Sequence, residues 1–306
     1  MTMSKHLTLA ILLAIGVAMA SPAKAYNVFP FYGDPSHALK WGDNTVGSPG
    51  GVVTWSLMKD GTGLDATAPS YIHGTSNLSS ILGSLDTAYG AGTALQLIQN
   101  AFDHWSAVAN IQFVYVGEDD GTDFSAPYAP GQVIGDIRIG AFDIDGFSGA
   151  VGYAPPPNGS TTLEGDILFN LNVAYGVAPG AEGDQYYLYP WPSPTAPGTH
   201  DGWYHNDFEG LFAHELGHAL GMAHSDVPSA LMCGYVDANF DGGQCSYFDQ
   251  APYDGLVPIN RIPDADDIAG IRYLYGAAPV PEPQYYALWA AGLGLLALRL
   301  KGRTRA

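Results

Sequence analysis

The residues best suited to do chemistry lie in the stretch GLFAHELGHALGMAHS, residues 210–225. On an α-helix, side chains four positions apart project from the same face, so His214 and His218 can direct their imidazoles to one ion. Histidine nitrogens bind Zn²⁺ in tetrahedral sites at about 2.0–2.1 Å. Glu215 follows the first histidine and can act as a general base on zinc-bound water, whose pKa the metal lowers toward ~7. The spacing therefore predicts a catalytic zinc site on a helix.

The third histidine of the stretch can reach the same ion only if the helix ends before it. Gly221 can adopt a left-handed conformation that ends the helix, after which the chain returns His224 to the metal. Three neutral histidines leave a fourth position open for water and substrate. Two other interpretations compete, a helix with chance histidines and a purely structural zinc. Five matching positions argue against the first, and structural sites normally have a fourth protein ligand.

The segment HELGHALGMAHS, followed by SALM, resembles the metzincin zinc peptidases and, through Ser225 and Met232, their matrixin subfamily. The resemblance implies that Met232 forms the Met-turn, a thioether packed beneath the metal. It also implies an α+β fold, with a twisted, mostly parallel sheet, an active-site helix and a C-terminal helix. The implied activity is that of a zinc metalloendopeptidase with protein or peptide substrates. Further segments that carry the resemblance are VTWSL, AFDHWSAVANIQF, GDIRIGAF, EGDILF and DDIAGIRYLYG.

Some residues depart from the matrixin pattern. No cysteine precedes Cys233, so the resemblance does not extend to a zymogen held by a propeptide cysteine. Val151 and Leu168 stand where the family has histidines for a second, structural zinc, and we therefore expect one zinc only. Asp166 and Asn170 remain candidate calcium ligands in the EGDILFN segment.

The two cysteines of the chain, Cys233 and Cys245, enclose an acidic segment. In an exported protein they are expected to form a disulfide. Between them, Asp237, Asn239 and Asp241 alternate before a glycine, as in the first half of an EF-hand calcium loop, but the twelfth position is phenylalanine rather than glutamate. The segment is thus a candidate calcium site or an ordinary polar turn closed by a disulfide.

The elements that must position these residues can be read from hydrophobic periodicity. A helix is expected over 92–109, and the motif helix is expected to start at a cap formed by Asn206 or Asp207. A closing helix is expected over 262–276, capped by Asp264, and strands are expected at 51–57, 111–116, 135–142 and 164–173. The residues expected to face inward are Leu95, Ile98, Phe102, Trp105 and Val108 in the first helix, Ile268, Ile271 and Leu274 in the closing helix, and Ile167, Phe169 and Leu171 in the last strand.

The stretch 178–206 has no periodicity and is expected to be a long functional loop. His104 is interpreted as a packing histidine of the first helix, and no role is assigned to His200 or His205. Hydrophobic residues make up 47% of the chain, which is enough for a sizeable core. Between residues 26 and 281 the chain has 29 acidic and 5 basic residues, a local charge of 5 − 29 = −24. Such a charge excludes nucleic-acid binding, which needs clustered Lys and Arg.

Both termini look like processing segments. Residues 1–25 combine Lys5, an apolar run and Ala23-x-Ala25, and this pattern predicts a secretory signal peptide. VPEP at 280–283, the apolar run that follows and an Arg-rich end resemble the PEP-CTERM sorting signal of Gram-negative bacteria. The resemblance implies an exosortase partner and transient membrane anchoring through 285–300, whereas a permanent tail anchor is the alternative. The expected division is 1–25 signal peptide, 26–35 N-terminal segment, 36–277 catalytic domain and 278–306 sorting signal.

These features favour an exported zinc endopeptidase at the cell surface or in the extracellular matrix, with substrate added as an extended strand at a sheet edge. The competing interpretation is a non-catalytic surface or biofilm-matrix protein that uses a peptidase fold for binding. Degenerate enzymes usually lose a metal ligand or the base, and here His214, Glu215, His218 and His224 are all present.

Overall fold

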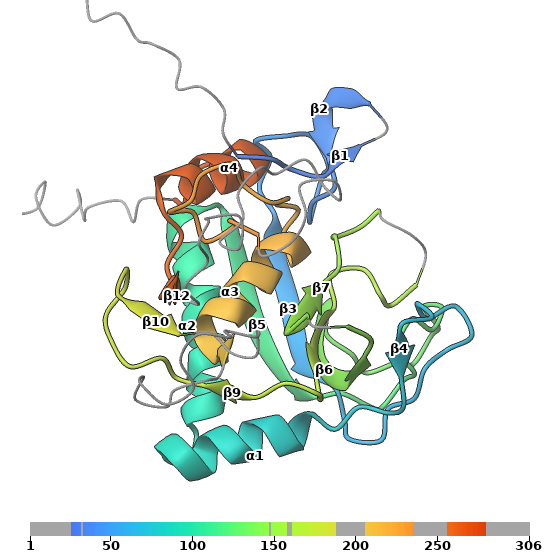
Figure 1. The fold of residues 1–306 in the computed structure, drawn as a ribbon. Coiled ribbons are helices and arrows are strands. Elements are labelled where there is room, and N and C mark those ends of the chain that lie inside the picture. Colours follow the sequence, from blue (N-terminus) through green and yellow to red (C-terminus); the bar gives the residue numbers. More distant parts are fainter. Residues whose placement is uncertain are drawn as a thin grey trace, which may run out of the picture.

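The computed structural model describes residues 26–31, 33–146, 148–157, 161–187, 206–234 and 256–279. The main sheet consists of β3 (Gly51–Leu57), β4 (Ile72–His73), β5 (Ile111–Glu118), β6 (Ile137–Ile144), β7 (Ala150–Gly152) and β8 (Ile167–Asn170). The strand order is β5-β3-β6-β8-β7, and β4 pairs with β6 (Figure 1). The pairs β3–β5, β3–β6 and β6–β8 are parallel, and only β4 and β7 run antiparallel to their partners. The predicted α+β fold with a mostly parallel sheet is confirmed.

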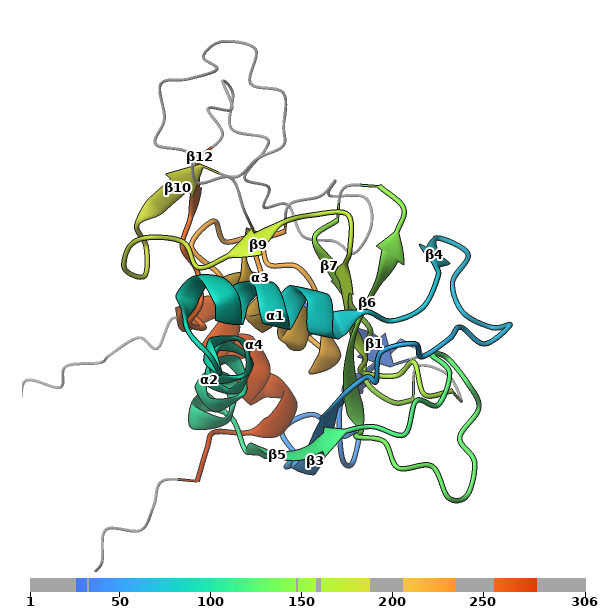
Figure 2. The same cartoon turned by 90° about the horizontal axis from the view of Figure 1, so that it is seen from below.

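The helices lie together on one side of the main sheet, as the two views in Figures 1 and 2 show. Trp105 in the longest helix donates its indole N–H to the carbonyl of Ala213 in the motif helix, with a distance of 3.0 Å. This hydrogen bond satisfies a buried polar atom that would otherwise destabilise the core. The helices of the described residues are α1 (Leu78–Tyr89), α2 (Thr93–Val108), α3 (Phe208–Ala219) and α4 (Ala265–Tyr275).

Stacked aromatic rings fill the space between the sheet and the helices. Trp55 of β3 stacks on Phe102 of α2 with ring centroids 4.7 Å apart, and Phe102 contacts Phe212 of α3 edge-on at 5.6 Å. Phe169 of β8 stacks on Phe208 at the start of α3, also at 4.7 Å. Each such side chain stabilises the fold by about 1.5–3 kcal/mol on burial. The core therefore fixes the motif helix α3 against both α2 and the sheet.

Three of the five residues predicted to face inward in α2 are fully buried. Ile98, Phe102 and Trp105 are fully buried, but Leu95 is 37% exposed. Val108 is only partly buried against the core. The buried stripe of α2 has i, i+3, i+4 spacing and includes small residues, and Leu95 lies one residue outside it. The buried residues are Ala94, Leu97, Ile98, Ala101, Phe102 and Trp105.

The other predicted elements are close to those observed. In α4, Ile271 and Leu274 are fully buried and Ile268 is half-buried. In β8, Ile167 and Phe169 face the helices as predicted, but Leu168 on the opposite face is buried as well, in a second apolar cluster. The strand is therefore covered on both faces, as is common for strands of parallel sheets.

Several short elements have no counterpart in the sequence-based prediction. In addition to α1, they include two strands, β10 and β11, in or at the end of the stretch 178–206, which is predicted to be a long functional loop. β10 pairs antiparallel with β12, β9 pairs parallel with β11, and β1 and β2 form an antiparallel ribbon. Residues 188–205 of the expected loop, with His200 and His205, lie outside the described residues. The bounds are β1 (Pro30–Phe31), β2 (Asp34–Ala38), β9 (Tyr175–Gly176), β10 (Gln185–Tyr187), β11 (Asn206–Asp207) and β12 (Leu256–Pro258).

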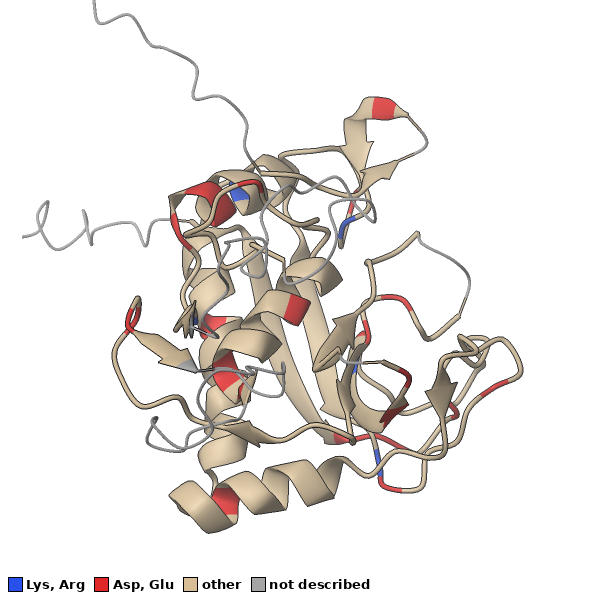
Figure 3. Cartoon of the chain, viewed as in Figure 1, with Lys and Arg blue, Asp and Glu red and all other residues tan. Residues whose placement is uncertain are grey.

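Acidic residues are spread over many elements and basic residues are few (Figure 3). Two of the basic side chains are buried, because Lys40 and Arg138 are each only 1% exposed. Arg138 forms an ion pair with the buried Asp119 at 2.7 Å, and its backbone N–H donates to Asp166 at 2.9 Å. Burial raises the pKa of Asp166 well above its usual value, and Arg138 opposes this shift. Arg138 therefore neutralises a buried carboxylate, whereas the Lys40 ammonium donates to the carbonyls of Trp41 and Asp43 and to the Ser48 hydroxyl.

Within the described ranges, none of the helices has the length and apolar character needed to cross a bilayer. Residues 1–25 and 285–300, where a signal peptide and a membrane anchor are predicted, lie outside those ranges.

Candidate metal centre

The motif helix α3 begins at the predicted cap. The Asp207 carboxylate accepts a hydrogen bond from the Gly210 N–H at 3.0 Å, as an N-cap residue does. The same carboxylate is held by Arg261, whose Nε and Nη2 atoms donate to its two oxygens at 2.8 and 2.7 Å. The start of α3 is thus fixed by local capping and by a bidentate ion pair from a distant segment.

The end of α3 turns at Gly221, which has a φ of 98°. A Cβ atom at this position would lie 2.2 Å from the carbonyl oxygen of Leu39. Only glycine combines this left-handed conformation with so close a backbone contact. The turn brings the chain back to His224, as the spacing of the motif predicts.

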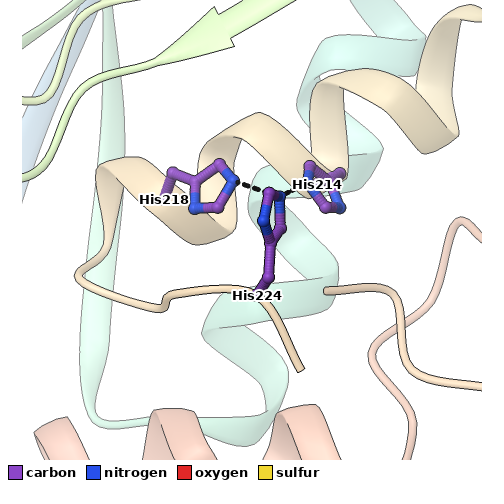
Figure 4. Close-up of side chains that lie close together, drawn as sticks. All are labelled: His214, His218 and His224. Carbon is purple, nitrogen blue, oxygen red and sulfur yellow. Dashed lines mark hydrogen bonds between the residues drawn. The ribbon is translucent and has the colours of Figure 1, made fainter. Parts of the chain in front are cut away.

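The three motif histidines converge on one point (Figure 4). His214 and His218 project from α3, and His224 approaches from the segment after the turn. The Nε2 atom of His224 lies 3.2 Å from the Nε2 atoms of both other histidines. Among the described residues, these three histidines form the cluster of metal-binding side chains (His, Cys, Asp or Glu) that is large and close enough to hold a metal ion.

The tautomers of two histidines fit a metal between the rings. Nδ1 of His214 lies 2.7 Å from the carbonyl of Leu231, and Nδ1 of His218 lies 2.9 Å from the carbonyl of Met222. A carbonyl only accepts, so each Nδ1 carries the proton and, in a neutral ring, each Nε2 presents a lone pair. Two nitrogens at ~2.0–2.1 Å from one tetrahedral Zn²⁺ are roughly 3.3 Å apart, close to the observed spacing. The site therefore fits zinc.

Glu215 lies beside the histidines, with its carboxylate turned to the edge of the sheet. Its Oε2 atom accepts a hydrogen bond from the backbone N–H of Gly152, the last residue of β7, at 2.6 Å. Burial raises the pKa of Glu215 to about 7, while His224 and the Gly152 N–H oppose the shift. A buried carboxylate with such a pKa can exchange a proton near neutral pH.

Met232 lies beneath the helix that carries two of the histidines. A Cβ atom at Gly217 would be 2.2 Å from the Met232 sulfur, so the thioether packs against the helix backbone next to His218. Asp267 of α4 holds this part of the chain, because its carboxylate accepts the backbone N–H groups of Leu231 at 2.7 Å and Met232 at 3.0 Å. Met232, the predicted Met-turn residue, thus packs under the part of α3 that carries the two histidines.

The segment between His224 and Met232 is closed by further hydrogen bonds. The Ser225 N–H donates to the Met232 carbonyl at 2.8 Å. The Ser225 hydroxyl donates to Asp266 of α4 at 2.6 Å and accepts the Val227 N–H at 3.0 Å. The loop is therefore anchored at both ends, and α4 supplies carboxylates to each.

A small cleft that is open to solvent adjoins the histidine cluster. His214 and Leu231 line its side toward the cluster, and Tyr186, Leu211 and Asn260 are among the residues that line the rest. The lining combines apolar side chains with polar groups such as the amide of Asn260.

The other predicted site residues have different outcomes. Cys233 is buried, but Cys245 lies outside the described residues, so the disulfide stays a prediction. The candidate calcium ligands Asp237, Asn239 and Asp241 also lie outside them. Calcium binding by this segment therefore stays a prediction.

In the EGDILFN segment, Asn170 uses its side-chain amide to donate to the carbonyls of Ile144 at 3.0 Å and Ser148 at 2.9 Å. Val151 and Leu168 are paired across β7 and β8. Outside this segment, His104 contacts the carbonyl of Arg261 at 3.2 Å. These contacts give Asn170 and His104 packing roles in the fold.

Gly152 and Asp267 contact the site but have no role in the sequence-based prediction. Gly152 shows no periodic signal, because it lies in a strand of three residues. Asp267 is visible only as part of an acidic first turn of α4, where it also completes the capping box with Asp264. The long-range contact to Met232 cannot be read from that pattern.

A helix that carries two histidines four residues apart with an intervening glutamate, and a third histidine after a glycine turn, defines the class of zinc-dependent metallopeptidases. The family model described as "Peptidase_M10: Matrixin" matches residues 77–249 of 306, which is more than half of the chain. The chain therefore belongs to the matrixin family, as the resemblance of the motif indicates.

Three relatives illustrate the similarity. The hatching enzyme of Paracentrotus lividus is 30% identical over 186 residues, which are 59% of this chain and 22% of the relative. Matrix metalloproteinase-16 of Homo sapiens is 29% identical over 191 residues, 61% of this chain and 24% of the relative. Macrophage metalloelastase of Oryctolagus cuniculus is 30% identical over 198 residues, 61% of this chain and 30% of the relative. The matched region thus spans less than a third of each relative.

Proposed function

We propose that this chain is an exported zinc-dependent endopeptidase that hydrolyses peptide bonds in extracellular or surface proteins. The observation that carries the proposal is the convergence of three histidine Nε2 atoms at 3.2 Å beside the buried carboxylate of Glu215. Membership of the matrixin family, whose members are zinc-dependent endopeptidases, supports the same conclusion.

In this proposal His214, His218 and His224 hold the zinc, and Met232 forms the floor beneath it. Zinc supplies a Lewis acid that polarises the scissile carbonyl and lowers the pKa of water. Glu215 takes a proton from the attacking water as the carbon–oxygen bond forms. It then delivers this proton to the nitrogen of the leaving amine as the carbon–nitrogen bond breaks. The Gly152 N–H, at 2.6 Å, orients the carboxylate for both transfers.

We propose that the substrate lies extended along β7. Among the described strands β7 pairs only with β8, so its second edge can add a strand. Because Gly152 of this strand also contacts Glu215, a peptide bound there would pass directly by the carboxylate. The cleft beside His214 would then face the residue next to the scissile bond.

We further propose that the tails direct the enzyme to its place of action. Residues 1–25 would serve as a signal peptide, 26–35 as an N-terminal segment and 36–277 as the catalytic domain. Residues 278–306 would act as a PEP-CTERM sorting signal that an exosortase recognises, with transient anchoring through 285–300. The amino-acid pattern of both tails supports delivery to the surface or matrix of a Gram-negative bacterium.

The test is cleavage of an unfolded protein by the full chain, purified in detergent and loaded with zinc. We expect hydrolysis that is lost on chelation and falls about 10²–10⁴-fold in Glu215→Gln, which keeps the shape of the side chain but cannot act as a base. Zinc content should be the same in wild type and Glu215→Gln. If zinc-loaded wild type cleaves no protein or peptide, the peptidase proposal is wrong and a non-catalytic matrix-binding role takes its place.

A further inference from the structure

The N-terminal residues of the described chain run beside the segment that carries the third histidine. Val28 and Met222 form an antiparallel bridge. The Ala223 N–H donates to the Asn27 carbonyl at 3.0 Å, and the Phe29 N–H donates to the Gly221 carbonyl at 2.9 Å. Residues 27–29 therefore act as a short strand for residues 221–223, which join the second histidine to the third.

One side chain of this strand reaches the third histidine itself. The Asn27 amide nitrogen donates to the carbonyl oxygen of His224 at 2.9 Å, across 197 residues of sequence. Together with the Ala223–Asn27 hydrogen bond, it ties the backbone on both sides of the Cα atom of His224. This matters because His224 does not lie on α3 and is not held by helix geometry, in contrast to His214 and His218.

The next side chain contacts the second histidine. The ring of Phe29 lies 5.9 Å from the ring of His218, at an interplanar angle of 38°. The Phe29 carbonyl accepts the Leu39 N–H at 3.1 Å, and the Leu39 carbonyl in turn approaches Gly221 so closely that a Cβ atom would not fit. The backbone of Phe29 is therefore held at both its N–H and its carbonyl, and its ring lies beside the imidazole of His218.

We propose that Asn27 and Phe29 are positioning residues that preorganise the metal site, Asn27 for His224 and Phe29 for His218. The inference rests on the proposed zinc function but concerns how the apoprotein holds its ligands before the metal arrives. A ligand set that is already in place loses little entropy on binding. Outer partners of metal ligands typically change metal affinity 10–100-fold when they are removed.

The experiment measures the zinc dissociation constant of the full chain by competition with a chromophoric chelator. Asn27→Ala removes the donor, and Asn27→Asp keeps the shape but turns a carboxylate toward the carbonyl of His224. We expect zinc affinity to fall from wild type to Asn27→Ala and further to Asn27→Asp. The affinity of Asn27→Asp should be at least tenfold below that of wild type. Phe29→Ala should also weaken binding, and Phe29→Leu, which restores apolar bulk, should recover part of the loss.

Asn77→Ala serves as the matched control, because Asn77 is exposed at the start of α1 and makes no side-chain cap bond. Its zinc affinity should equal that of wild type. Urea unfolding of the chelated proteins separates a positioning role from general destabilisation, because a positioning residue changes zinc affinity more than it changes apoprotein stability.

Equal zinc affinity in wild type, Asn27→Ala and Asn27→Asp would overturn the inference and leave the proposed peptidase function intact. Loss of affinity that only parallels apoprotein unfolding would overturn it as well. Absence of zinc binding by wild type would overturn both. Tight zinc binding without hydrolysis, together with the expected order of the variants, would overturn the proposed peptidase function alone.

Discussion

Gly221→Ala provides the sharpest test of how the turn before His224 is built. The residue has a φ of 98°, and a Cβ atom would lie 2.2 Å from the Leu39 carbonyl oxygen. That oxygen belongs to the backbone, so no rotation of a side chain can relieve the contact. The substitution must therefore move either the turn or the segment that contains Leu39.

The magnitude follows from two separate costs. Placing a residue with a Cβ in a left-handed conformation costs about 1–2 kcal/mol. Overfilling a packed region typically costs a further ~1–3 kcal/mol. We therefore expect Gly221→Ala to lower the free energy of unfolding by about 2–5 kcal/mol and to weaken zinc binding, because the same turn carries His224.

The assay is urea unfolding of wild type and variant, each with chelator, followed by measurement of zinc affinity. Gly83→Ala is the matched control, because it makes the same chemical change inside α1, where nothing lies within 4 Å of the new Cβ. Alanine is favoured over glycine in a helix by about 0.8–1.0 kcal/mol, so Gly83→Ala should be stabilising. The two substitutions are expected to have opposite signs. A loss below ~1 kcal/mol in Gly221→Ala, with unchanged zinc affinity, would show that the turn is not built as described.

Three further results are expected. Removal of zinc by a chelator should lower the melting temperature of wild type but not that of His218→Ala, because a ligand at 1,000 times its Kd stabilises a protein by about 4 kcal/mol. An equal change in melting temperature in both proteins would count against the site. Arg261→Ala leaves the Asp207 carboxylate, which is 4% exposed, without its bidentate partner, and should lower the free energy of unfolding in urea by about 3 kcal/mol. A decrease below about 1 kcal/mol would contradict the role of this pair. Burial lowers the pKa of Lys40 to about 8, with Asp43 opposing the shift. The unfolded chain then binds more protons between pH 8 and 10.5, so the stability of wild type relative to Lys40→Met should rise with pH over that range, and a flat or falling difference would refute the shift.

Features set by local sequence were predictable. The cap at Asp207, the capping box of Asp264 and the turn at Gly221 each depend on a few neighbouring residues whose chemistry is specific. The convergence of the three histidines follows in the same way, from helix periodicity and one glycine.

Features set by packing partners were not predictable from the same patterns. Leu95 was expected inside because of its residue type, yet the stripe of α2 uses the smaller Ala94 and Ala101 where the helix lies close to its neighbours. The contacts of Asp267 with Met232 and of Asn27 with His224 join residues 35 and 197 positions apart. No periodicity links such pairs, so only the folded chain reveals them.

The hydrogen bonds of Tyr275 have a consequence for the order of events during synthesis. Its hydroxyl accepts the Trp41 N–H at 3.0 Å and donates to the Leu220 carbonyl at 2.8 Å, at the end of the histidine-bearing helix. Trp41 and Tyr275 are 234 residues apart, and a chain is made from its N-terminus. The end of α3 therefore lacks this support until α4 has been made. A folding chain therefore completes its centre only after α4 has docked beside the end of α3.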